Sequence, residues 1–126
     1  MKIAIAFAVL TLTATVVGAQ TNPIKRTDLQ QIDHPDGYTT LMAIVEIAPN
    51  HAVPAHTHPG AEVVYVMEGE MTITLAGKQP LKVKAGDSLA IPANTVHHGT
   101  MGPAGVKLLN TYVLEKGKPM SSPASP

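Results

Sequence analysis

The chain has 126 residues with nine basic and nine acidic side chains, so its formal net charge is zero and its length suits one domain. With one Phe, three Tyr, no Trp and no basic excess, it lacks the charge and the stacking groups that nucleic-acid binding uses, so we expect no nucleic-acid partner. Cysteine is absent, which excludes disulfides and thiolate ligands. Any metal site must therefore use nitrogen and oxygen ligands.

The first residues have the pattern of an export signal. Met1-Lys2 is followed by an apolar run from Ile3 to Val17, and the small residues Gly18-Ala19 come next. This order is typical of a secretory signal peptide. The alternatives are a membrane anchor and a buried helix, but the run of about 15 residues is shorter than the roughly 20 that a span needs. We predict a signal peptide over residues 1–19, cleaved after Ala19. The mature chain would then be exported, periplasmic or secreted, and not inserted in a membrane.

The rest of the chain is punctuated by turns and shows strands, with no strong helix. Ten Gly and eleven Pro residues interrupt it too often for long helices. The expected strands are Arg26–Ile32, Thr40–Ala48, Glu62–Glu68, Met71–Leu75, Leu81–Lys84, Ser88–Ile91 and Val106–Glu115. Gly69 is expected to end one of them and Gly77 to open a hairpin turn. Seven or eight short strands indicate an all-β barrel or sandwich.

The chain divides into four parts on this evidence. Residues 20–39 form an N-terminal arm and first strand, and residues 40–116 form the β-barrel. Residues 117–126 are rich in Pro and Ser and are expected to be a flexible tail. The sequence shows no repeat and no second domain.

The strongest chemical signal lies between Pro54 and Glu62. On an extended strand, residues two apart point the same way, so His56 and His58 present two imidazoles to one side. Pro59-Gly60 bends the chain, and Glu62 can then return its carboxylate to the same place. His97 follows another turn and could close the site from across the barrel. We predict that these four residues bind a metal ion.

The chemistry of this ligand set narrows the ion to one divalent transition metal. Imidazole and carboxylate ligands suit Fe, Mn, Ni, Cu, Co or Zn, and the ligands alone do not choose among them. Four protein ligands on a six-coordinate ion would leave two positions open. A structural zinc site is less favoured because closed sites of that kind usually contain thiolates.

The stretch from His56 to Gly69 resembles the first motif of the cupin superfamily: His-x-His, three residues, Glu, six residues, Gly. A Gly usually stands six residues before the first His, and this chain has Asn50 there. Asn adopts the left-handed backbone more readily than most residues, so the departure is mild.

The stretch from Gly86 to His97 resembles the second cupin motif: Gly, five residues, Pro, one residue, Gly, two residues, His. Asn94 stands in for the second Gly, and Met101 replaces the Asn that often follows four residues after the His. The latter position does not bind metal in the family. The resemblance covers roughly Thr40 to Glu115 and is similar to that of small bacterial cupins.

This resemblance implies a double-stranded β-helix, the jelly-roll barrel of antiparallel strands. It assigns the metal-ligand role to His56, His58, Glu62 and His97, one by one. It also implies a homodimer formed by exchange or pairing of the N-terminal strand. The expected partner inside the barrel is a small-molecule ligand or substrate.

Three further residues are candidates for positions around the metal. Asn110 and Tyr112 share one face of the last strand with Leu108, and they reach the site if that face is inward. His98 should point away from His97 if the backbone is extended, although it could also be an outer donor or an alternative ligand. By the same parity, Val64 and Val66 should face inward with Glu62.

Three functions are compatible with these observations. The first is a small metalloenzyme, either a dioxygenase similar to quercetinase-type cupins or a lyase or isomerase, with Glu62 as a candidate general base. The alternative is a non-enzymatic periplasmic module that binds or senses a small ligand or metal. The third is a storage or structural role. An open site of nitrogen and oxygen ligands favours the enzyme.

Overall fold

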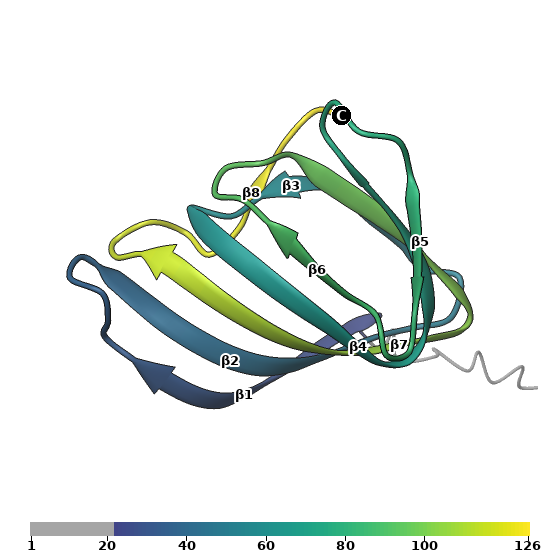
Figure 1. Ribbon diagram of the computed structural model, residues 1–126, viewed down its shortest axis with the longest axis horizontal. Coiled ribbons are helices and arrows are strands. Elements are labelled where there is room, and N and C mark those ends of the chain that lie inside the picture. The colour runs from purple at the N-terminus through teal and green to yellow at the C-terminus, as the bar shows by residue number, and fades with distance from the viewer. Residues whose placement is uncertain (1–21) are drawn as a thin grey trace, which may run out of the picture.

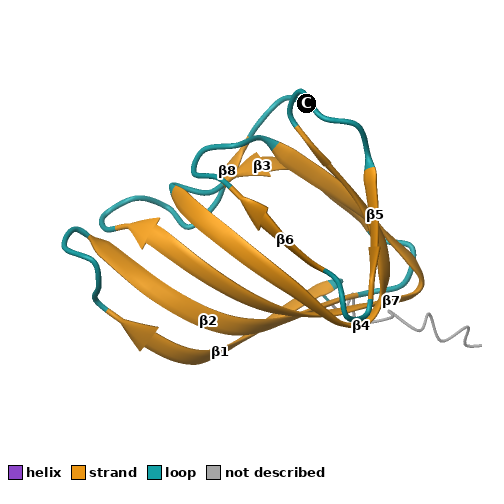
Figure 2. Ribbon diagram, in the orientation of Figure 1, coloured by secondary structure: helices purple, strands orange, loops and turns teal. Residues whose placement is uncertain are grey.

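The computed structural model describes residues 22–126, and within them every regular element is a β-strand (Figure 2). The eight strands are β1 (Ile24–Ile32), β2 (Tyr38–Ile47), β3 (Ala52–Thr57), β4 (Gly60–Leu75), β5 (Leu81–Lys84), β6 (Ser88–Ile91), β7 (His97–Glu115) and β8 (Ser122–Pro123). The predicted signal peptide lies outside the described residues. This part of the chain contains no helix long and apolar enough to cross a membrane.

The strands form two layers that share two long strands, as Figure 1 shows. The second half of β7 pairs with β2 and with the first half of β4, and the first half of β7 pairs with β3 and with the second half of β4. β1 extends the first layer beyond β2, and β6 extends it beyond β4. β8 and β5 extend the second layer. All pairings are antiparallel, so the all-β jelly-roll prediction is confirmed.

The two long strands bend where they pass between the layers, and glycines make the bend possible. Gly69 in β4 and Gly105 in β7 both have positive φ, of 82° and 70°. A Cβ at Gly69 would overlap the carbonyl oxygen of Gly105, so no other residue fits there. The prediction that Gly69 ends a strand is wrong. The strand continues through it, with register shifts on either side that bend the ladder without ending it.

Alternation along the strands places the core between the layers. Val64 and Val66 are almost fully buried beside Glu62, whereas Val63, Tyr65 and Met67 are exposed on the outer face. On β7, Leu108, Asn110 and Tyr112 are buried. Both inward faces therefore agree with the predicted parity. The core is aliphatic and methionine-rich, and polar groups enter it at one place.

The C-terminal tail runs from one layer to the other. After β7 ends beside β2, the chain crosses to β3, where Ser122–Pro123 pairs with His56 and Thr57 (Figure 1). The amide of Ala124 also donates to the carbonyl of Ala55, at 3.0 Å. Part of the segment predicted to be flexible is thus placed against the barrel edge.

Candidate metal centre

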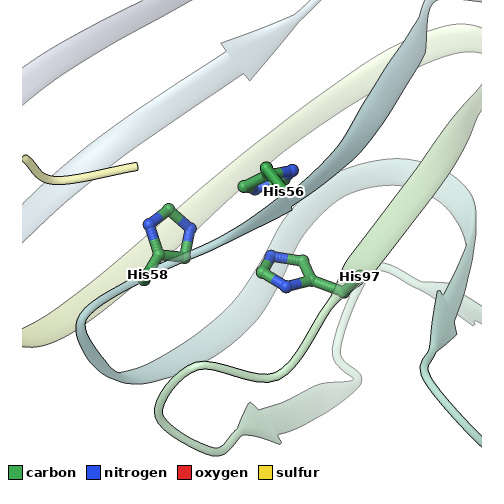
Figure 3. A group of neighbouring side chains, drawn as sticks. All are labelled: His56, His58 and His97. Carbon is green, nitrogen blue, oxygen red and sulfur yellow. The ribbon is translucent and has the colours of Figure 1, made fainter. Parts of the chain in front are cut away.

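Three imidazoles converge inside one end of the barrel. His56 lies near the end of β3, His58 in the turn that follows it, and His97 is the first residue of β7 (Figure 3). The pairing of β3 with β7 places His56 opposite His97, and their ring centroids are 4.2 Å apart. His58 is 5.0 Å from His56 and 5.3 Å from His97 by the same measure. One nitrogen from each ring lies within 4.8 Å of the others, so the cluster is compatible with a single metal ion.

Each of the three rings is oriented by one backbone carbonyl. His56 Nδ1 lies 2.8 Å from the carbonyl oxygen of Pro54, and His97 Nδ1 lies 2.9 Å from that of Thr95. His58 Nδ1 lies 2.7 Å from the carbonyl oxygen of Met120. Because a carbonyl only accepts, Nδ1 must carry the proton in all three rings. The Nε2 atoms are the ones left to bind a metal, which is the arrangement found around ligating histidines in general.

The Glu62 carboxylate lies against two of these rings. Its Oε2 is 3.2 Å from His58 Nε2 and 3.5 Å from His97 Nε2, and its side chain is buried. Burial would raise the pKa of Glu62, but the hydrogen bonds and charges of His58 and His97 outweigh it and lower that pKa to about 2. Glu62 is therefore a carboxylate at neutral pH. It could supply negative charge to a dication held by the neighbouring imidazoles.

The pKa values of two histidines shift in opposite directions. Burial lowers the pKa of His56, since the charged ring would lose its hydration. Burial also acts to lower the pKa of His58, but the hydrogen bonds to Glu62 and to the Met120 carbonyl raise it overall. The pKa values of His56 and His58 differ in direction because the Glu62 carboxylate is hydrogen-bonded to His58 and not to His56.

Asn110 and Tyr112 stand behind the carboxylate. Asn110 Nδ2 donates to Glu62 Oε1 at 2.7 Å and to the Tyr112 hydroxyl at 2.9 Å. The opposite amide orientation would set two oxygens against each other, so the amide nitrogen must face Glu62. Burial raises the pKa of Tyr112, which keeps its phenol protonated. Asn110 Oδ1 is buried and has no hydrogen-bond partner in the described chain.

A cavity of about 150 Å³ opens from this cluster into the barrel. Its polar lining comes from the three imidazoles, Glu62, Asn110, Tyr112 and His98. The other walls are apolar, with contributions from Val64, Met71, Ile73 and Leu108. It is smaller than the roughly 300–1,000 Å³ of pockets for drug-sized ligands. The cavity therefore suits a small molecule with one polar end.

The remaining motif positions also have defined places. Asn50 and Asn94, which replace the usual glycines, have φ of 56° and 58°, so both adopt the left-handed backbone that the motif requires. His98 is paired opposite Thr74 and lies outside the imidazole cluster. It is half-buried and borders both the central cavity and a second one near Lys78.

Residues 43–115 match the cupin domain family. The chain belongs to the cupin family. It is 32% identical over 91 residues to a germin-like protein of Morus alba, a match that covers 65% of this chain and 44% of that protein. The chain thus spans less than half the length of this curated relative.

Solved structures share the fold. A cupin superfamily protein from Desulfitobacterium hafniense has a TM-score of 0.63 at 21% identity, over 79% of this cupin and 84% of that chain. The polyketide cyclase RemF from Streptomyces resistomycificus has a TM-score of 0.64 at 25% identity, over 82% of this cupin and 72% of that chain.

Sequence reasoning did not find Met120. Its contribution to the site is a backbone carbonyl, 62 residues from His58, in a segment with the composition of a loose tail. No side-chain pattern could mark it. Pro54 and Thr95, by contrast, lie two residues before the histidines that they orient.

Proposed function

We propose that this cupin holds one divalent transition-metal ion through His56, His58, His97 and Glu62 and is a metalloenzyme for a small organic substrate. One observation carries the proposal: two buried imidazoles and one half-buried imidazole each direct Nδ1 to a backbone carbonyl, and their Nε2 atoms converge beside a carboxylate. Without a metal, the converging Nε2 atoms would be partly removed from water with few hydrogen-bond partners, which is unfavourable. With a metal, each atom has a role.

The ion belongs to the group Fe, Mn, Ni, Cu, Co and Zn, because the ligands are imidazole and carboxylate. A bound ion of this group would supply Lewis-acid chemistry, polarising an oxygen of the substrate. Four protein ligands leave room for such an oxygen. The neighbouring Asn110 amide holds Glu62 in place.

The cavity indicates the kind of substrate. Its apolar walls suit a short hydrocarbon body, and its polar end suits an acid, enol or hydroxy ketone. Asn110 Oδ1 lacks a donor, so we propose that a hydroxyl of the substrate fills this position. Dioxygenase-like, lyase and isomerase reactions all begin from substrates of this kind, and RemF is a cyclase of polyketides.

Glu62 is the candidate general base. It is the single carboxylate among the cavity-lining residues that the structure describes. Both of its oxygens face hydrogen-bond partners, and Tyr112 stays protonated. This scarcity of free bases favours a second candidate function, in which the chain captures a small ligand or a metal without converting it.

Metal content tests the first part of the proposal. The full chain is recovered from the periplasm, the compartment that we propose for it, and its metals are measured by elemental analysis. We expect about one ion per chain, loss of the ion in His56→Ala and His97→Ala, and full retention in His34→Ala, which alters an exposed turn. A metal-free wild-type chain that also binds none of the six ions when they are added would refute it.

Turnover separates the enzyme from the binding module. The metal-loaded chain is incubated with flavonols, dicarboxylates, sulfonium compounds and small hydroxy ketones, and products are followed by mass spectrometry. Product formation that is lost in Glu62→Gln with metal retained supports the general base. Retention of both rate and metal in that variant excludes the role. Tight binding without any product supports the binding module.

A further inference from the structure

We propose that the C-terminal tail, residues 117–126, is a strap whose Met120 carbonyl holds His58 ready for metal, so that metal binding and docking of the strap support each other. This inference rests on the proposed metal site. It assigns a positioning role to a segment that lies outside both cupin motifs. Met120 acts through His58 and does not itself touch the metal position.

The three carbonyls that orient the histidine rings come from different parts of the chain. Those of Pro54 and Thr95 belong to the chain just before His56 and His97, so they come with the local backbone. The carbonyl for His58 comes from the tail. His58 alone among the three therefore depends on a segment that must dock before the ring is fixed.

The strap is bound to the barrel at both of its ends. At its start, the Lys116 amide donates to the Gly37 carbonyl at 2.9 Å, and Lys116 Nζ lies 3.0 Å from Asp33. At its far end, Ser122–Pro123 pairs with the edge of β3, beside His56. The segment between these points crosses from one layer to the other.

Met120 itself makes a side-chain contact with the barrel. The Arg26 guanidinium on β1 contacts the Met120 sulfur. Met120 is half-buried, whereas its neighbours Pro119 and Ser121 are exposed. The side chain is thus directed toward the barrel, and its carbonyl reaches the His58 ring.

Docking of the strap and metal binding are linked equilibria, because both involve the His58 ring. Partners that fix the tautomer of a metal-binding histidine typically change metal affinity by roughly 10–100-fold. If docking of the strap raises the affinity for metal by such a factor, bound metal must raise docking of the strap by the same factor. Docking of the strap and binding of the ion are then thermodynamically coupled through the His58 ring.

The test compares the full chain with a chain that ends at Lys118, with Zn²⁺ as the probe and a chelating indicator as competitor. We expect Zn²⁺ affinity to fall roughly 10–100-fold on truncation. Met120→Ala is the matched control, because it keeps the carbonyl and the pairing of β8 and removes only the Arg26 contact, so we expect a much smaller loss of affinity than truncation causes. Equal affinity in the full and truncated chains, or an equal loss in Met120→Ala, would overturn the role of the carbonyl.

Nitrogen-15 NMR of the metal-free chains gives a readout that general loosening of the fold would not produce. In the full chain, Nδ1 should carry a proton in all three rings, and His58 Nε2 can also be protonated toward Glu62. In the truncated chain, Nδ1 of His58 should be deprotonated in part of the molecules, while Nδ1 of His56 and of His97 stays protonated. A His58 ring that behaves like the other two after truncation contradicts the proposal.

A measurement on the full chain covers the case in which the truncated chain does not fold. The Ala124 amide, bonded to Ala55, should exchange with solvent roughly 10–100-fold more slowly when Zn²⁺ is bound. An unchanged exchange rate of the Ala124 amide in a Zn²⁺-loaded chain would refute the coupling between strap and metal but not the proposed metal site. Failure of the chain to bind any of the six ions would sink both.

Discussion

At the scale of single residues, the site depends on groups that hold the ligands as much as on the ligands. Glu62 uses Oε2 toward the imidazoles, while Oε1 accepts a hydrogen bond from Asn110. Because Asn110 also donates to Tyr112, the amide is fixed at two points. The carboxylate therefore faces the imidazoles of the proposed metal site in one orientation.

Removing this support should weaken the metal site without removing a ligand. We expect Asn110→Ala to lower metal affinity by roughly 10–100-fold, the usual effect of losing an outer partner of a ligand. Competition titration with Zn²⁺ measures the change. Thr111→Ala is the control, because that side chain belongs to the opposite face of the same strand. An Asn110→Ala affinity equal to that of the control would show that Glu62 needs no such support.

Three of the four residues predicted to be ligands could be found from local rules, whereas His97 was assigned through its resemblance to the second cupin motif. His56 and His58 are two apart on an extended chain, and Glu62 follows a bend. Asn50 and Asn94 could be assigned to left-handed turns for the same local reason, and both are there. The Met120 carbonyl could not be found, since a main-chain group carries no signal in the sequence.

At the scale of elements, the two bent strands determine the architecture. β4 and β7 each belong to both layers, so the barrel has no separate halves to slide apart. The sequence predicted the two flanks of the β4 bend as separate strands because glycine often bounds a strand, and it predicted only the second flank of the β7 bend, Val106–Glu115. It could not show that Gly69 and Gly105 lie against each other, because that contact depends on how the two strands are registered.

This close approach makes Gly69 sensitive to substitution. Gly69→Ala combines a left-handed backbone with a Cβ that meets the Gly105 carbonyl, and we expect it to lower the free energy of unfolding by about 2–5 kcal/mol. Gly77 has a similar φ of 74° and open space around it, so Gly77→Ala should cost only about 1–2 kcal/mol. Urea denaturation compares the two. Equal losses would mean that the backbone angle alone matters.

At the scale of the whole molecule, one outer face carries several exposed apolar side chains. Val63, Tyr65 and Met67 on β4 are 52%, 47% and 39% exposed, and Met42 on β2 is 37% exposed. Thr111 of β7 pairs with both Val63 and Met42, so these side chains form one continuous patch. A patch of this kind often marks an interface. We propose that it forms a homodimer interface, which differs from the pairing of the N-terminal strand that the cupin resemblance implies.

The patch can be tested by adding charge to it. Val63→Glu should shift the chain from dimer to monomer in sedimentation velocity, because a carboxylate would be buried without a partner. Thr72→Glu alters an exposed position on the other half of β4 and should leave the dimer unchanged. A wild-type chain that is already monomeric at high concentration would contradict the proposal. A Val63→Glu dimer would place the interface elsewhere, with the open edge of β1 as the next candidate.

The three strands that carry the ligands come together from distant parts of the sequence. His56, Glu62 and His97 meet only when β3, β4 and β7 have paired, and pairing of distant strands is the slow part of folding for all-β proteins. Before that point, an ion meets separate imidazoles that can take any metal in any geometry. Afterwards it meets a fixed set. A metal bound through these residues, as proposed above, would therefore meet its complete ligand set only after the strands have paired, and the metals available in the compartment where this happens would select the ion.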